Sequence, residues 1–107
     1  MAFVNLTPHA IVVVRNEGNI TIQPSGQIAR CAQKSESAGS FDGVPLVTSE
    51  FGPVEGLPEP VMGTVYVVSA LVRAAVPNRR DVASPGDQVR DADGRVTGCR
   101  NLIINNG

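Results

Sequence analysis

Short apolar segments alternate with turn residues along most of the chain, and this pattern predicts a β-rich fold. In the first third, the turn at residues 16–19 contains Gly18 and lies between two β-branched segments, which indicates a hairpin. The segment before this hairpin is interrupted by Thr7-Pro8. The strands predicted here are residues 3–6, 10–15, 20–23 and 28–32.

The middle of the chain contains fewer apolar residues and is predicted to be mostly loop. Residues 33–43 are small and polar, which predicts a mobile loop. Residues 44–48 predict a short strand, and Pro45 places it at a sheet edge or at a strand start. Residues 49–63 contain three prolines and three glycines, so we expect a second, long loop. Loops of this length are often functional, and this one carries apolar side chains at Phe51, Leu57 and Met62.

Residues 64–68 are apolar nearly throughout and predict a central strand. Ser69 follows as an N-cap, and Pro77 ends the helix that it begins. Within this helix, we expect Leu71 and Ala75, with Val72 and Val76, to face inward and Arg73 to point elsewhere.

The last third predicts a second hairpin. Residues 82–83 form a brief strand, and residues 88–90 pair with residues 95–104 across a turn at 91–94, with Gly94 in the left-handed conformation. The tail at residues 105–107 is expected to fray. Together the elements predict one domain over residues 1–107, of the α+β class and β-rich. We expect a small twisted, partly closed antiparallel sheet of five to seven strands with one helix.

Composition narrows the class of partners. The net charge is −1, so no overall positive field attracts long nucleic acid. The sequence does not show the basic segment and long apolar run that are typical of a signal peptide. No apolar run is long enough to span a membrane, so we expect a cytoplasmic protein. In that compartment Cys31 and Cys99 are expected to be free thiols. With one histidine, His9, they do not complete a zinc site, and no cofactor or metal is predicted.

Arginine is the main candidate for function. The chain has eight arginines and one lysine, Lys34, and six of the arginines lie between Arg73 and Arg100. The planar guanidinium suits carboxylate and phosphate, so this block favours an anionic ligand. The expected contacts are Arg79, Arg80, Arg90, Arg95 and Arg100. The alternative is a solvated hairpin face, in which these arginines pair with neighbouring aspartates in weak salt bridges.

Three further residues are candidates for the same site. The amides after Ser69 begin a helix and are suited to an anion, although simple capping is the alternative. Tyr66 and Phe51 offer rings on which a base could stack, although Tyr66 also suits the core. No nucleophile, base or metal motif accompanies them, so no catalytic residue is predicted and the protein is not expected to be an enzyme.

Several short motifs resemble a family of small uncharacterised proteins from actinobacterial and phage genomes. They are the N-terminal Asn5-Leu6-Thr7-Pro8-His9-Ala10-Ile11 and, towards the C-terminus, Val89-Arg90-Asp91, Gly94-Arg95 and Gly98-Cys99-Arg100. The resemblance covers most of the chain and implies a phage or prophage setting. It transfers no catalytic residue, because the family carries no established chemistry.

We therefore predict non-catalytic sequestration of a small phosphorylated, nucleotide-like ligand by a homo-oligomer, a dimer or larger. In a phage setting this suggests a sponge that counters bacterial immune signalling, by analogy of type alone. The alternatives are a protein–protein inhibitor of a host protein, a small phosphodiesterase-like enzyme using His9, and a virion accessory protein.

Overall fold

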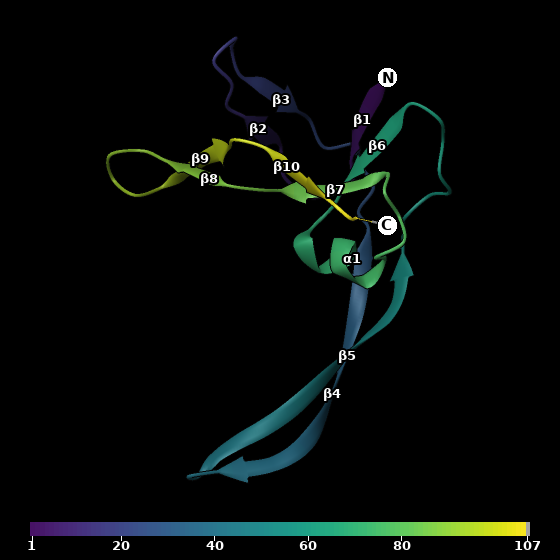
Figure 1. Ribbon diagram of the computed structural model, residues 1–107, viewed down its shortest axis with the longest axis vertical. Helices are drawn as coiled ribbons and strands as arrows, with labels where there is room; N and C mark the ends of the chain where they lie inside the picture. Colours follow the sequence, from purple (N-terminus) through teal and green to yellow (C-terminus); the bar gives the residue numbers. More distant parts are fainter. Residues whose placement is uncertain (107) are drawn as a thin grey trace.

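The computed structural model describes residues 1–106 and confirms a β-rich α+β fold (Figure 1). The strands are β1 (Ala2–Asn5), β2 (Ile11–Val13), β3 (Ile20–Ile22), β4 (Arg30–Phe41), β5 (Val44–Glu55), β6 (Thr64–Val67), β7 (Val82–Pro85), β8 (Gln88–Arg90), β9 (Val96–Cys99) and β10 (Leu102–Ile104). The helix α1 spans Ala70–Ala75. The β2–β3 hairpin, the central strand β6 and the β8–β9 hairpin all follow the sequence pattern.

The strands form three sheets, where the pattern had predicted one antiparallel sheet. Two four-stranded sheets have the orders β1-β6-β7-β10 and β3-β2-β9-β8, and β4 pairs with β5 alone. Within residues 1–106 none of these sheets closes. The pairs β1–β6, β6–β7 and β2–β9 are parallel. Parallel neighbours need a crossover connection, and α1 provides it between β6 and β7.

The core lies where the two four-stranded sheets and α1 meet, and we call this part of the molecule the body. One cluster packs Leu6, Tyr66, Val68, Val72 and Val82 together. A second joins the sheets through Val67, Ile11, Ile22 and Cys99. β6 lies between β1 and β7 and contributes to both clusters, which explains why its sequence is apolar on both faces.

The helix is short and both of its ends are hydrogen-bonded by side chains. Ser69 Oγ accepts from the amide of Val72, as expected for an N-cap. The expected inward face is only partly right, because Val72 is buried while Leu71 is exposed. Arg73 also differs from expectation, since its guanidinium donates to Ser84 Oγ at 2.8 Å and to Asn105 Oδ1 at 3.2 Å.

The prediction that the tail frays is wrong at Asn105, while Gly107 lies outside the described residues. Asn105 is buried, and its side-chain amide donates to the carbonyls of Arg73, Val76 and Arg79 at 2.9–3.1 Å. The carbonyls at the end of a helix have no partner within the helix. Asn105 supplies that partner from a position late in the chain.

The N-terminal motif is organised around another buried asparagine. Asn5 donates to the carbonyls of His9 and Ile22, at 2.8 and 3.0 Å, while its Oδ1 accepts from the amide and hydroxyl of Thr7. Ser25 Oγ donates to the Asn5 carbonyl at 2.7 Å. The motif therefore connects β1 to the β2–β3 hairpin, and its conformation is explained by folding without any ligand.

The long β4–β5 hairpin, which we call the arm, is the largest departure from expectation. Residues 33–43 were predicted to be a mobile loop and residues 49–63 a second loop, but β4 and β5 pair from Arg30–Glu55 to Phe41–Val44. Pro45 fits, because β5 has β4 as its single neighbour. The sequence pattern does not predict the arm because its strands contact the core at their base, through Cys31 and Val54, and elsewhere pair with each other without an alternation of buried and exposed positions.

A two-residue turn closes the arm. Asp42 and Gly43 have φ values of 51° and 79°, both in the left-handed region. Two such residues form the turn whose twist matches a β-hairpin, and Asp-Gly is one of its preferred sequences. Phe41 and Val44 pair directly across it.

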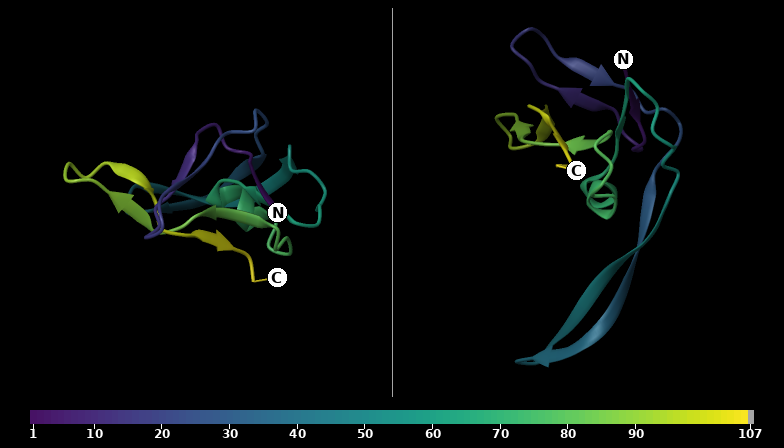
Figure 2. Two further views of the ribbon diagram at one scale, coloured as in Figure 1. Left: turned by 90° about the horizontal axis from the view of Figure 1, so that it is seen from above. Right: turned by 45° about the vertical axis from the view of Figure 1, so that its right-hand side comes forward.

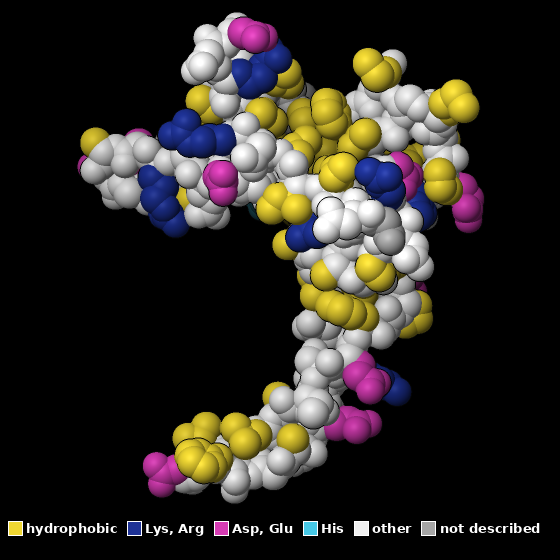
Figure 3. All heavy atoms as spheres, in the orientation of Figure 1, with side chains coloured by type: hydrophobic (Ala, Val, Ile, Leu, Met, Phe, Trp, Pro, Cys, Tyr) yellow, Lys and Arg dark blue, Asp and Glu magenta, His cyan; other side chains and the backbone are white. Residues whose placement is uncertain are grey.

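The arm projects away from the body, as two further views make clear (Figures 1 and 2). The radius of gyration is 16.4 Å. A compact chain of this length is expected to have a value of about 13 Å. A space-filling view shows the molecule hollowed between the arm and the β8–β9 hairpin, with apolar side chains gathered near the end of the arm (Figure 3).

Candidate functional site

The arginine block divides between two parts of the molecule. Arg79 and Arg80 lie in the connection from α1 to β7, whereas Arg90, Arg95 and Arg100 belong to the β8–β9 hairpin and its exit. In Figure 1 and in the left view of Figure 2, that hairpin points away from the α1–β7 connection. The five side chains predicted to bind one ligand are therefore distributed over two separate surfaces.

Arg79 is held within the structure. Its Nε and Nη2 atoms each donate to one carboxylate oxygen of Asp81 at 2.8 Å, and Nη2 also donates to the carbonyl of Pro58 at 3.0 Å. The bond to Asp81 raises the pKa of Arg79, and the bond from Arg79 lowers the pKa of Asp81. Arg79 thus connects the chain before β6 to the start of β7, and three of its five N–H donors are engaged within the fold.

The hairpin arginines are exposed. Arg90 donates to the carbonyl of Gly94 at 2.8 Å and to Gln88 Oε1 at 2.9 Å, which stabilises the turn of its own hairpin. The side chains of Arg95 and Arg100 are exposed, and neither has a carboxylate within salt-bridge distance in the described part of the chain. Of the salt bridges that the alternative interpretation predicted, only the Arg79–Asp81 pair forms in the described part of the chain.

The other predicted ligand residues are equally dispersed. Tyr66 is buried and its hydroxyl donates to the Glu59 carbonyl at 3.3 Å, so its ring has no exposed face for stacking. Ser69 caps α1. Phe51 lies on the arm with half of its surface exposed.

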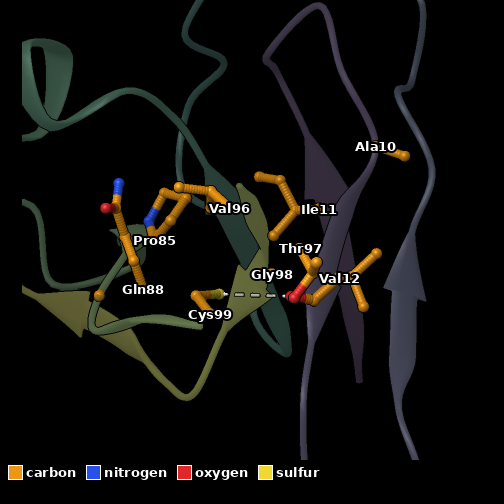
Figure 4. Close-up of a pocket in the computed structure, with 10 residues that line it drawn as sticks. Ala10, Ile11, Val12, Pro85, Gln88, Val96, Thr97, Gly98 and Cys99 are labelled. Atoms are coloured by element: carbon orange, nitrogen blue, oxygen red, sulfur yellow. Dashed lines mark hydrogen bonds between the residues drawn. The ribbon is translucent and has the colours of Figure 1, made fainter. Parts of the chain in front are cut away.

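One pocket opens where the two four-stranded sheets meet (Figure 4). It has a volume of about 250 Å³, and its walls come from β2, β9 and the β7–β8 connection. Cys99 lies in it with its thiol directed at the Val12 carbonyl, 3.6 Å away. None of the predicted arginines lines this pocket, and its side chains are neutral. It is small and uncharged for a phosphorylated nucleotide.

A second pocket, which we call the Phe3 pocket, lies beside the edge strand β1. Its volume is about 420 Å³, within the range of ligand pockets. It is lined by Met1, Phe3, Thr64, Val65, Arg80 and Asp81, among others. Arg80 is exposed here and has no carboxylate within salt-bridge distance in residues 1–106, whereas Asp81 is already paired with Arg79. The pocket is thus largely apolar, and the guanidinium of Arg80 at its wall is unpaired within residues 1–106.

The outer half of the arm carries a patch that the sequence pattern did not reveal. Phe41, Val44 and Leu46, which we call the tip patch, have exposed fractions of 73%, 58% and 44%. Phe41 lies opposite Val44, and Leu46 follows two residues later, so the three share a face. Val47 and Phe51 are also exposed farther along β5. The available signal was the Asp42-Gly43 turn flanked by Phe41 and Val44.

The chain offers no metal cluster in its described part, since no three His, Cys, Asp or Glu side chains group together there. Across residues 1–106, α1 is the single helix and it is too short to cross a membrane. No protein-family model, curated protein or solved structure matches the chain.

Proposed function

We propose that this protein acts by non-catalytic binding of another protein chain, with the arm as the binding element. The observation that carries this proposal is the exposed tip patch at the end of a hairpin that leaves the body. Isolated exposed apolar residues are ordinary, but a contiguous group is typical of an interaction surface. Two-stranded hairpins are also marginal by themselves, so an apolar end that stays in water gives the arm little stability.

The chemistry of the arm fits a protein partner. Phenylalanine is enriched in the buried centres of interfaces, and the tip patch presents Phe41 at its most exposed position. Polar residues next to the tip patch, Ser37, Ser40 and Thr48, surround the apolar ones on β4 and β5. This arrangement of an apolar centre with a polar rim is the usual anatomy of a binding surface.

The first experiment compares protein capture by the wild type with capture by a tip variant, Phe41→Ser with Leu46→Ser. Both changes are at exposed positions, so the fold should be retained. The matched control is Ser35→Ala with Ser49→Ala, which alters a directly paired couple on the same arm. We expect the wild type and the control to bind a protein partner, a second copy of the chain included, and the tip variant to lose this binding. Identical binding by all three proteins would contradict the proposal.

The Phe3 pocket supports a second candidate, sequestration of a small phosphorylated, nucleotide-like ligand. From the predicted arginine set, Arg80 lines this pocket, whose volume is suitable for such a ligand. The phage setting comes from the family resemblance, and the role against bacterial immunity comes from an analogy of type. The test is mass spectrometry of molecules released when protein incubated with a nucleotide mixture is washed and denatured. A near-stoichiometric nucleotide that Arg80→Ala no longer retains is expected, and an empty, folded protein excludes this candidate.

A further inference from the structure

We infer that the protein partner of the arm is a second copy of this chain, whose Phe3 pocket receives the tip patch. This inference rests on the proposed role of the arm and names its occupant. The tip lies at the end of the molecule opposite β1 in Figure 1 and in the right view of Figure 2, so it does not reach the pocket of its own chain. A second copy brings tip and pocket together.

Apolar surfaces match on the two sides. The tip presents Phe41, Val44 and Leu46, and the pocket presents Phe3, with half of its surface exposed, beside Val65. β1 is the edge strand of its sheet, so this wall of the pocket has no further strand covering it. Bringing the two surfaces into contact removes both from water, which is the principal driving force for association.

Charge distribution favours the same pairing. The outer arm, residues 33–51, carries Lys34 against Glu36, Asp42 and Glu50, a net charge of −2. The whole chain has a net charge of −1, so the remaining residues carry +1. Two identical molecules therefore attract when the arm of one approaches the body of the other, and repel when arm approaches arm.

The match extends to single residues. Asp42 is exposed at the end of the arm, next to Phe41, and has no salt-bridge partner in the described part of the chain. Arg80 is exposed at the wall of the pocket, and the neighbouring Asp81 is occupied by Arg79. A docked tip places the free carboxylate of Asp42 near the free guanidinium of Arg80, which is the group that it would pair with.

The area involved suits a reciprocal pair. Three side chains that are about half exposed carry on the order of 300 Å² of accessible surface. With two-fold symmetry, each copy contributes one tip and one pocket, so the tip-to-pocket contact is made twice. A pocket surface of similar size brings the total to about 600 Å² per partner, at the lower end of the range for a standard interface. A single one-sided contact would bury only about half of this.

The first measurement is the mass of the purified protein in solution by light scattering, over a range of concentrations. We expect a dimer for the wild type. Two variants should weaken the dimer: the tip variant (Phe41→Ser with Leu46→Ser) and a pocket variant (Phe3→Ser with Arg80→Gln). Each should have a dimer dissociation constant at least about tenfold higher than that of the wild type. The control is Ser35→Ala with Ser49→Ala, which should behave as the wild type.

Mixing the two variants tests the geometry directly. One tip and one pocket stay intact in a mixed pair, so native mass spectrometry should show a heterodimer in excess of either homodimer. A contact of tip with tip would give no such preference. Circular dichroism of each variant establishes that it is folded, so loss of dimer is attributable to the contact.

A double-mutant cycle tests the Asp42–Arg80 pair. Asp42→Asn is suitable because asparagine tolerates the left-handed turn while removing the charge. Asp42→Asn and Arg80→Gln should each raise the dissociation constant about tenfold, and the double variant should be little worse than either. Effects that multiply in the double variant would overturn the pairing.

The outcomes separate this inference from the proposed role of the arm. A monomeric wild type that binds another protein through the tip patch overturns the second-copy inference and leaves the proposed function intact. A dimer unaffected by the tip variant also overturns the inference. A tip variant that matches the wild type in mass and in every protein bound overturns both.

Discussion

Arg79 and Asp81 are joined by two parallel hydrogen bonds of 2.8 Å, although only one residue separates them in the sequence. Both side chains are largely shielded, with exposed fractions of 23% and 19%. Because Arg79 also donates to the carbonyl of Pro58, the pair fixes the connection before β6 against the start of β7. An arginine that looked available for a ligand is instead part of the framework of the fold.

This pair predicts a pH dependence of stability. The hydrogen bond from Arg79 lowers the pKa of Asp81 from its ordinary value of 3.8. The pair therefore stabilises the fold fully above pH 3.8, and this stabilisation is lost as the pH falls through the lowered pKa of Asp81. We expect Asp81→Asn to reduce the free energy of unfolding by about 1–2 kcal/mol at pH 7. The deficit relative to wild type should shrink below pH 3.8, as measured by urea denaturation. A deficit that stays constant down to pH 2 would contradict this account.

For Asn105, near the end of the chain, we predict a larger loss of stability than for Asp81. Asn105→Ala removes the three hydrogen bonds that the side-chain amide donates to carbonyls at and after the end of α1. It also removes the oxygen that accepts from the guanidinium of Arg73. We expect a loss of about 2–3 kcal/mol in the free energy of unfolding, measured by chemical denaturation. Asn106→Ala, at the exposed neighbour, is the control and should change the stability little. Equal effects of the two substitutions would show that the cap contributes nothing.

From the hydrogen bonds of Asn5, we predict that the N-terminal motif contributes to the stability of the fold. Asn5→Ala leaves the carbonyls of His9 and Ile22 without their side-chain donor and removes the acceptor used by Thr7. A loss of about 2–3 kcal/mol is expected, because Asn5 is buried and its hydrogen bonds are buried or partly buried. Thermal unfolding followed by circular dichroism measures it, with the exposed Asn19→Ala as the control. A variant as stable as the wild type would contradict this structural role.

The turn at Gly43 offers a way to destabilise the strand pairing of the arm without affecting the body. Gly43→Ala places a Cβ at φ 79°, although no atom lies close enough to clash with it. The conformational cost is about 1 kcal/mol, and it falls on a hairpin with little apolar support. Hydrogen exchange should accelerate in residues 33–51 and stay unchanged in β6. Equal acceleration in both regions would show that the arm and body unfold together.

The elements of the body follow from the sequence because each has a local signal. Ser69 and Pro77 bracket α1, and Gly94 with φ 81° turns the β8–β9 hairpin as expected. The pairing of strands has no such signal. β1 and β6 are parallel neighbours across some sixty residues, and no local pattern states which distant strand a segment joins.

The arm shows a different limitation. Serine and glycine in residues 33–43 are common in loops, and this interpretation outweighed the Asp-Gly turn that follows Phe41. The candidate site was missed for the same reason, because an apolar tip counts as a surface only when its strands are known to leave the body. In the arginine block, composition located the residues but did not reveal that Arg79 is already paired.

The strand pairing has a consequence for how the molecule assembles. β1 depends on β6, and β2 depends on β9, so neither four-stranded sheet is complete until the C-terminal third of the chain is available. Pairings between such distant segments carry a high loop-closure cost and fold slowly. The arm, in contrast, closes from adjacent residues in a register that starts at Phe41 and Val44. During synthesis, the apolar end of the arm is therefore complete while the body is still unfinished.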